Sequence, residues 1–167
     1  MRLLNSFRYA FRGIIYCINN ERNMRIHTVA ALYVFAFSFF FHLSSAEYGV
    51  LLLTFAIVMM GELFNTAAED LSDITVTGFS PVIRGVKDMA SGAVLVGAFF
   101  AVGVAVCLFR SPESFVAIRD YFVQRPAMLA ALAATGVLST VYVVLGPLGI
   151  RDRFRKRKAR RERKKSK

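Results

Sequence analysis

Three acidic side chains and one amide follow one another at helical spacing near the end of a long apolar run. Glu62, Asn65, Glu69 and Asp73 stand three and four residues apart, after a segment from 49 to 61 that contains no charged residue. On an α-helix with about 100° per residue, all four side chains project from one stripe. Ionisable groups inside membrane-spanning segments usually face protein or water and serve a function. We therefore interpret the stripe as a candidate active site, although Asp73 alone would also suit an ordinary helix exit from lipid.

Two carboxylates at different depths on one helix face can divide a reaction between them. The deeper one, Glu62, suits a general base for a hydroxyl at the membrane interface. Mg2+ prefers a few carboxylates together with phosphate oxygens, so Glu69 with Glu21 and a bound nucleotide would make a reasonable shell. An ion pair between Glu21 and Arg25 is the alternative explanation for that acid. Lys87 would neutralise charge on a transferred phosphate, which favours a lipid-alcohol kinase that uses ATP and Mg2+.

Familiar nucleotide and metal motifs do not occur in this sequence. It holds no P-loop, no protein-kinase glycine-rich motif and no Cys/His metal cluster. Any nucleotide site must therefore be of an unorthodox kind.

Composition places the chain in a membrane. Its mean hydropathy is +0.48 and 56% of its 167 residues are hydrophobic, which is too apolar for an ordinary soluble domain of 18.7 kDa. The amino terminus lacks the apolar core of a cleavable signal and should be retained. We predict an all-α integral membrane protein. Four runs meet the length of a span, about 17 to 25 mostly apolar residues, and they cover 26–43, 48–68, 89–109 and 127–150.

Positive charge is concentrated at the carboxyl end. The net charge is +11, and residues 151–167 hold twelve Lys or Arg and two acids, so the rest of the chain is nearly neutral. We expect this tail to be disordered and attracted to anionic lipid, with no nucleic-acid partner. Short basic segments beside spans stay cytoplasmic. With four spans, both termini then lie on the cytoplasmic side of a bacterial plasma membrane.

The remaining segments can be assigned from their periodicity. Between residues 3 and 18, apolar side chains recur at steps of three and four opposite Arg8 and Arg12, which predicts an amphipathic helix on the membrane surface. Gly78, Pro81 and Gly85 predict a loop over the carboxylate stripe. The predicted order is an interfacial helix over 1–25, a three-span catalytic core over 26–109, an extracytoplasmic loop over 110–126, a fourth transmembrane helix over 127–150 and a basic cytoplasmic tail over 151–167.

Three short segments together are more specific than any one of them. They read NERNMRIH from Asn20, GELFNTAAEDLSD from Gly61 and VKDMASGAVL from Val86. This combination resembles the prokaryotic diacylglycerol kinase and undecaprenol kinase family of small membrane enzymes. The spacing from Glu62 to Ser91 matches without insertion, and the resemblance covers about residues 2–109.

The resemblance implies roles for the matched residues. Glu62 would be the catalytic base, with Asn65 supporting it. Glu21 and Glu69 would hold the metal that accompanies ATP. On the nucleotide side the implied residues are Lys87, Asp88 and Asp73. A softer match adds Arg2, Tyr9, Gly78, Phe79 and Ser80 to that side. On the lipid side the implied residues are Arg25, His27, Glu62 and Ser91.

His27 bears on the choice of lipid. ERN followed by His27 resembles the undecaprenol kinase branch, whereas diacylglycerol kinases tend to have an acid in place of this histidine. We predict phosphorylation of undecaprenol to undecaprenyl phosphate, with diacylglycerol kinase activity as the alternative and a plain interfacial role for His27 also open. The resemblance further implies a homotrimer with active sites shared between subunits and direct transfer from ATP.

Two features depart from the family pattern. Ser80 stands where the undecaprenol kinase branch often has a histidine. The usual member also ends after three spans, whereas this chain adds 127–150 and the basic tail. A fourth helix would shield the trimer rim, gate lipid entry or recruit a partner.

Two other classes of protein fit parts of the pattern. A small proton-coupled transporter would also keep one buried Glu, but it would place its key charge nearer mid-membrane. An inactive scaffold would use only the tail. The stripe together with Lys87 and Asp88 argues against both.

Overall fold

The described part of the chain is entirely helical. The computed structural model describes residues 2–75, 78 and 80–165, and side chains within 3–75, 78 and 80–153. No strand occurs in this part of the chain, which confirms the predicted all-α class. The helices are α1 (Arg2–Asn20), α2 (Arg22–Ser38), α3 (Ser45–Thr75), α4 (Pro81–Leu108), α5 (Pro112–Val123) and α6 (Pro126–Lys165).

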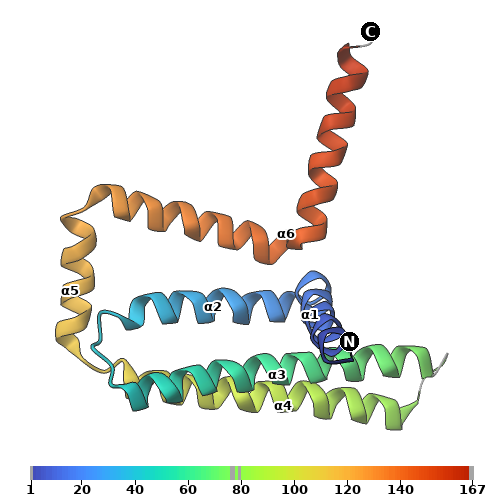
Figure 1. Cartoon of the computed structure of the whole chain (residues 1–167), viewed down its shortest axis with the longest axis horizontal. Coiled ribbons are helices and arrows are strands. Elements are labelled where there is room, and N and C mark those ends of the chain that lie inside the picture. Colours follow the sequence, from blue (N-terminus) through green and yellow to red (C-terminus); the bar gives the residue numbers. More distant parts are fainter. Residues whose placement is uncertain (1, 76–77, 79, 166–167) are drawn as a thin grey trace.

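Four helical segments run side by side. In Figure 1, α2, α3, α4 and the first part of α6 share one direction, and α5 crosses one end of this bundle. The α3–α4 pair packs most extensively, and α2 lies between α3 and α6. Helix α1 crosses the other end of the bundle, where it contacts α2, α3 and α6. The start of α2 and the second half of α3 therefore meet beside α1.

Among the described residues, three helices are long and apolar enough to cross a membrane: Ser45–Thr75, Pro81–Leu108 and the Pro126–Arg153 part of α6. The predicted first span is shorter than expected, because α2 has 17 residues. At 1.5 Å per residue it extends about 26 Å, whereas a hydrocarbon core is about 30 Å thick. Tight turns end it: the Phe41 N–H donates to the Ser38 carbonyl at 2.9 Å, and His42 has a φ of 49°, in the left-handed region.

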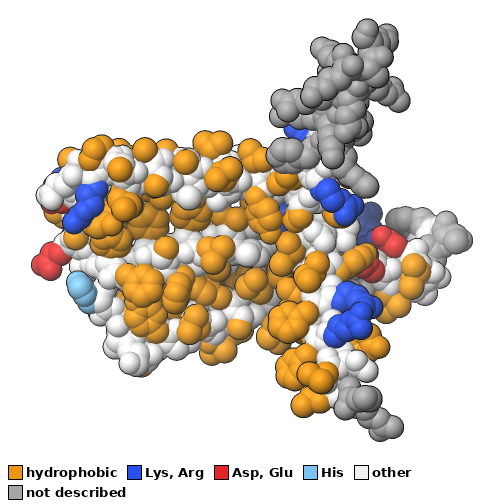
Figure 2. Space-filling model, turned by 45° about the horizontal axis from the view of Figure 1, so that its top comes forward, with side chains coloured by type: hydrophobic (Ala, Val, Ile, Leu, Met, Phe, Trp, Pro, Cys, Tyr) orange, Lys and Arg blue, Asp and Glu red, His pale blue; other side chains and the backbone are white. Residues whose placement is uncertain are grey.

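Apolar side chains cover the outside of the bundle. Figure 2 shows hydrophobic side chains across its middle and charged side chains near its ends. Helix α4 has no buried residue, and its Phe99 and Leu95 are 73% and 71% exposed. Contiguous apolar surface of this kind belongs against lipid or another subunit.

The connection between α3 and α4 is shorter than predicted. Helix α3 continues to Thr75 and α4 begins at Pro81, so Gly85 lies inside a helix and the predicted extent of the loop is wrong. Local capping explains the early start. The Ser80 hydroxyl accepts from the Ile83 N–H at 3.5 Å, and proline is favoured in the first helical turn.

The two ends of the chain also differ from expectation. The predicted boundary after residue 25 falls instead at Glu21, where α1 has ended and α2 begins. Helix α5 occupies most of the predicted loop 110–126. We expected a disordered tail, whereas the backbone of α6 is helical to Lys165. Lys, Arg, Glu and Ala are strong helix formers, so the apolar helix can continue into them.

Candidate active site

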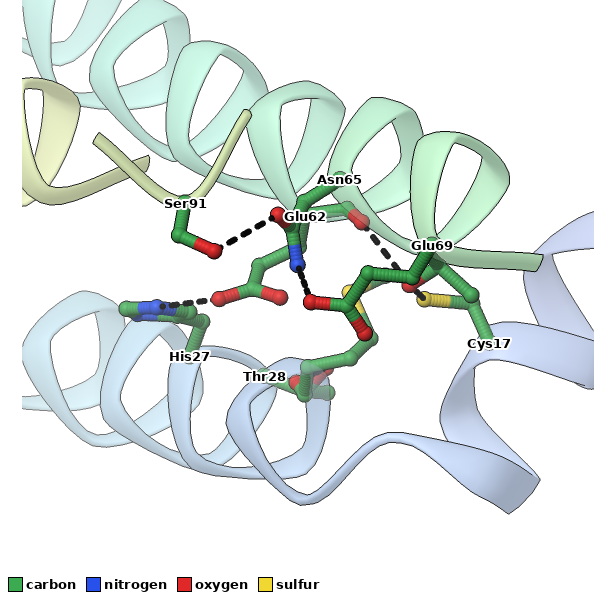
Figure 3. Close-up of polar contacts among 9 residues, drawn as sticks. Cys17, His27, Thr28, Glu62, Asn65, Glu69 and Ser91 are labelled. Atoms are coloured by element: carbon green, nitrogen blue, oxygen red, sulfur yellow. Dashed lines mark hydrogen bonds and ion pairs between the residues drawn. The ribbon is translucent and has the colours of Figure 1, made fainter. Parts of the chain in front are cut away.

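Glu62 is the most deeply buried carboxylate in the described residues. It lies on α3 with 1% of its surface exposed, and Figure 3 shows its carboxylate directed toward α2. His27 Nε2 of α2 is 3.3 Å from Glu62 Oε1. The pair is close enough for an ion pair but is not aligned as a hydrogen bond, so neither oxygen has a hydrogen-bond partner among the described residues. A buried carboxylate with free lone pairs is suited to accept a proton from a bound hydroxyl.

A chain of hydrogen bonds leads from α4 to Glu69. The Ser91 hydroxyl donates to Asn65 Oδ1 at 3.2 Å, and Asn65 Nδ2 donates to Glu69 Oε1 at 3.0 Å. Asn65 is itself buried, at 7% exposure. Figure 3 shows the carboxylates of Glu62 and Glu69 on the same side of α3, both directed toward α2. The stripe expected from helical spacing thus brings Glu62, Asn65 and Glu69 together.

A second polar contact ties α1 to the same turn of α3. Cys17 Sγ lies 3.2 Å from Thr66 Oγ1, and the Thr66 hydroxyl donates to the Glu62 carbonyl at 2.9 Å. Neither Cys17 nor Thr66 was predicted from the sequence to lie at the site. Thr66 follows Glu62 by four residues, and a helical threonine commonly bonds to that carbonyl, so spacing is a signal that could have found it. No pattern in the sequence indicates Cys17.

Glu21 stands at the break between α1 and α2 and is free of a capping role. Its backbone is extended, with φ −98° and ψ 123°, and its side chain makes no capping hydrogen bond. Burial raises the pKa of the Glu21 carboxyl, and the charges of Glu69 and Asp70 raise it further, while Arg25 opposes them. The negative charges of Glu69 and Asp70 thus disfavour a further negative charge on Glu21, and a cation beside Glu21 would offset this effect.

Lys87 and Asp88 diverge although they are neighbours in the sequence. Lys87 Nζ contacts Asp73 Oδ1, which joins α4 to the outer part of the stripe. Asp88 Oδ2 lies 4.0 Å from Arg84 Nε on its own helix, and both side chains are exposed. Asp88 thus does not join the cluster around Glu62.

The other predicted site residues lie outside this cluster. Tyr9 is exposed on α1, where the Arg12 guanidinium lies 5.7 Å from its ring centroid. Gly78 is exposed, and Ser80 caps α4. Phe79 and the side chain of Arg2 lie outside the described residues. Arg25 is buried, but its hydrogen bonds go to main-chain carbonyls of α1 and α6.

The carboxylates fit a metal ion that is shared with a nucleotide. Among the described residues, no group of three or more His, Cys, Asp or Glu side chains is arranged to hold a metal by itself. Mg2+ commonly takes only one or two carboxylates and completes its shell with phosphate oxygens and water. The charge of Glu69 raises the pKa of the Glu21 carboxyl, which is consistent with such a partial site.

A bundle of membrane-length apolar helices with a buried carboxylate toward one end is the architecture of an integral membrane protein. The family model of prokaryotic diacylglycerol kinase matches residues 8–109. The chain therefore belongs to this family of lipid kinases. Helices α5 and α6 follow the matched region.

Relatives with curated names agree with the family match. A diacylglycerol kinase of Synechocystis sp. is 42% identical over 111 residues, which are 66% of this chain and 63% of that protein. A diacylglycerol kinase of Helicobacter pylori is 30% identical over 99 residues, which are 59% of this chain and 77% of that protein. The chain thus spans less than two thirds of the length of the Synechocystis protein.

Proposed function

We propose that the chain is an ATP-dependent kinase that phosphorylates the hydroxyl of a membrane lipid at the cytoplasmic face of a bacterial plasma membrane. The observation that carries this proposal is the buried Glu62 carboxylate, whose oxygens lack hydrogen-bond partners among the described residues and lie beside His27. Membership of a lipid kinase family supports the same reaction.

In the proposed reaction Glu62 acts as the general base. Its carboxylate takes the proton of the lipid hydroxyl while the hydroxyl oxygen bonds to the γ-phosphorus of ATP. The bond from that phosphorus to the bridging oxygen breaks, and ADP leaves with the electron pair. Burial excludes water from Glu62, which favours transfer to the lipid over hydrolysis of ATP.

We assign the metal-holding role to Glu21 and Glu69. Asn65 orients Glu69 by donating a hydrogen bond to one of its oxygens and leaves the other oxygen available. Glu21 offers a carboxylate that no helix cap occupies. When bound with ATP, Mg2+ supplies positive charge that offsets the charge of the phosphates.

The nucleotide side of the site is proposed from the residues beyond Glu69. Lys87 would exchange its contact with Asp73 for a phosphate oxygen, because a triphosphate offers more negative charge than one carboxylate. Asp88 and Gly78 are exposed, as residues that contact a soluble nucleotide should be. The further nucleotide contacts proposed by family resemblance are Arg2, Tyr9, Phe79 and Ser80.

An apolar cavity supports a lipid as the second substrate. Its volume is about 300 Å³, and α2, α3 and α4 line it. Its wall includes Phe55 and Val58 from α3, and His27 is its polar member from α2. Since His27 also contacts Glu62, a lipid chain in this cavity would bring its hydroxyl end toward the base.

The proposed setting has both termini in the cytoplasm, and α1 lies on the membrane surface. Phe7 and Phe11 of α1 are 58% and 62% exposed, as side chains that enter the lipid interface should be. The uncovered apolar face of α4 suits a homotrimer with shared sites. The twelve Lys and Arg of the tail suit binding to anionic lipid.

Two lipid alcohols remain as acceptors. The segment ending in His27 favours undecaprenol, whereas the relatives are named diacylglycerol kinases, which favours diacylglycerol at least as strongly. The test offers both lipids separately, with radiolabelled ATP, to purified protein in detergent micelles. Faster labelling of undecaprenol is our expectation, and faster labelling of diacylglycerol would assign that activity instead. Labelling of neither lipid would show that the kinase proposal is wrong.

His27→Gln separates selectivity from catalysis in the same assay. If His27 selects the lipid, the ratio of the two rates changes in this variant. If His27 only holds Glu62, both rates fall together.

A further inference from the structure

Arg25 joins three helices through main-chain atoms. It is 6% exposed, and Nη1 donates to the carbonyls of Ile18 at 3.0 Å and Asn19 at 3.1 Å. Nε donates to the carbonyl of Val143 at 3.1 Å. Arg25 itself belongs to α2, the first two acceptors to α1 and the third to α6. One guanidinium therefore connects the family core to the added helix α6.

Each of these carbonyls lacks a normal helical donor. Helix α1 ends at Asn20, so Ile18 and Asn19 belong to its last turn, where carbonyls have no N–H within the helix. Val143 precedes Pro147 by four residues, and proline has no N–H to donate. Arg25 thus satisfies acceptors that the end of α1 and the kink of α6 leave open.

Gly146 is required where the two helices approach. Its φ is +65°, in the left-handed region, and a Cβ there would lie 3.0 Å from Arg25 Nη1 and 3.1 Å from Cζ. Figure 1 shows α6 changing direction near α1. The kink, the glycine and the arginine consequently form one joint, which we define as Arg25, Val143, Gly146 and Pro147.

The joint lies beside Glu21. The carbonyl acceptors at 18 and 19 precede Glu21 by three and two residues, and Arg25 follows it by four. Glu21 makes no capping bond, so its own side chain does not fix the backbone at this break. The three Arg25 hydrogen bonds hold both flanks of the break instead.

We propose that α6 braces the nucleotide side of the site through this joint, and that Arg25 is a positioning residue for Glu21. The inference rests on the proposed function, in which Glu21 holds the metal that accompanies ATP. The family match ends at residue 109, so the brace belongs to what this chain adds. Arg25 then acts on MgATP through Glu21 and not on the lipid.

The test compares Gly146→Ala with Gly136→Ala in the full chain in micelles. Residue 136 is a matched control on the same helix, because a Cβ there meets nothing within 4 Å. Amide hydrogen exchange of residues 17–25 reports the joint without any activity. Steady-state kinetics report KM for MgATP, KM for the lipid and kcat separately.

We expect Gly146→Ala to speed exchange over 17–25 and to raise KM for MgATP by about threefold to tenfold, the effect of losing one or two hydrogen bonds. KM for the lipid should stay unchanged, and Gly136→Ala should match wild type throughout. Arg25→Lys should show the same pattern, and adding Gly146→Ala to it should cause little further change because both act on one joint.

Other outcomes would overturn the proposal. Unchanged amide hydrogen exchange over residues 17–25 in Gly146→Ala would show that the joint does not stabilise the backbone between α1 and α2. Faster exchange with an unchanged KM for MgATP would make the joint purely structural, and a raised KM for the lipid alone would return Arg25 to the lipid side. If wild-type protein labelled no lipid, the proposed function would fail, while the exchange data would still decide whether the joint exists.

Discussion

His27 Nε2 lies 3.3 Å from Glu62 Oε1, although the two residues belong to different helices and stand 35 positions apart. The proposed base is therefore not a property of α3 alone. Packing of α2 against α3 buries the carboxylate and brings an imidazole to it. A carboxylate this deeply buried is costly unless a partner or a proton compensates its charge, and His27 is the residue placed to do so.

Replacement of Glu62 tests the base directly. Glu62→Gln preserves size but removes the proton acceptor, so kcat should fall by about 10² to 10⁴-fold while nucleotide affinity changes little. Kinetics and equilibrium binding of a labelled nucleotide measure the two quantities. Glu47→Gln, in the first turn of the same helix, is the matched control and should retain wild-type kcat. A Glu62→Gln enzyme with near-normal kcat would remove Glu62 from the mechanism.

The hydrogen-bond chain from Ser91 through Asn65 to Glu69 predicts graded effects on Mg2+ dependence. Glu69→Gln removes a metal-binding charge and should raise the Mg2+ concentration for half-maximal rate by about tenfold or more. Asn65→Leu should have a smaller effect in the same direction, because Glu69 loses its orienting donor. Ser91→Ala leaves the Asn65 donor in place and should change the Mg2+ concentration for half-maximal rate least. Equal effects of all three substitutions would contradict a role for this series of hydrogen bonds in Mg2+ binding.

The raised pKa of Glu21 predicts a pH dependence for Mg2+. A carboxyl with a raised pKa takes up its proton at a higher pH than an ordinary glutamate, and the protonated form cannot hold a cation. Apparent Mg2+ affinity should therefore decline as pH falls toward the raised pKa. Glu21→Gln should have lower affinity and lose this part of the pH dependence. An unchanged pH profile in the variant would exclude Glu21 as a metal-holding group.

The raised pKa of Glu21 also predicts how folding stability depends on pH. Folding raises the pKa of Glu21, so the folded state binds this proton more tightly, and stability declines as pH rises from the unfolded pKa to the folded pKa. At neutral pH the ionised group is destabilising. Glu21→Gln should consequently raise the Tm of the metal-free protein at pH 7, and the gain should disappear at a pH below both values. Thermal unfolding at the two pH values measures this difference.

The tail should act through charge. Removing residues 151–167 should leave activity in micelles largely intact and weaken binding to anionic liposomes, at about 1 kcal/mol for each basic residue that approaches the surface. The loss should shrink at high salt, since ions screen exposed charges. Neutral liposomes are the control and should bind both forms equally. Identical binding of both forms to anionic liposomes would contradict the electrostatic role.

Helical spacing predicted those site contacts that arise within one helix. Glu62, Asn65 and Glu69 were placed on one face of a helix, and the structure links Asn65 to Glu69. Lys87 and Asp88 were both assigned to the nucleotide side together with Asp73. Lys87 contacts Asp73, whereas Asp88 lies 4.0 Å from Arg84 on its own helix. The length of the α3–α4 connection was wrong because Ser80 and Pro81 form a helix start that outweighs Gly85.

What the amino-acid order determined by itself was the all-α class, the apolar runs and the face that carries the carboxylates, because each depends on periodicity over neighbouring residues. Tertiary structure alone decided that His27 meets Glu62, that Cys17 meets Thr66 and that Arg25 reaches Val143, 118 positions away. Periodicity shows which side chains share a face, but the partner of that face depends on how the helices pack. The carbonyls of Ile18, Asn19 and Val143 lack helical donors, and they become linked only because packing brings the Arg25 guanidinium to all three.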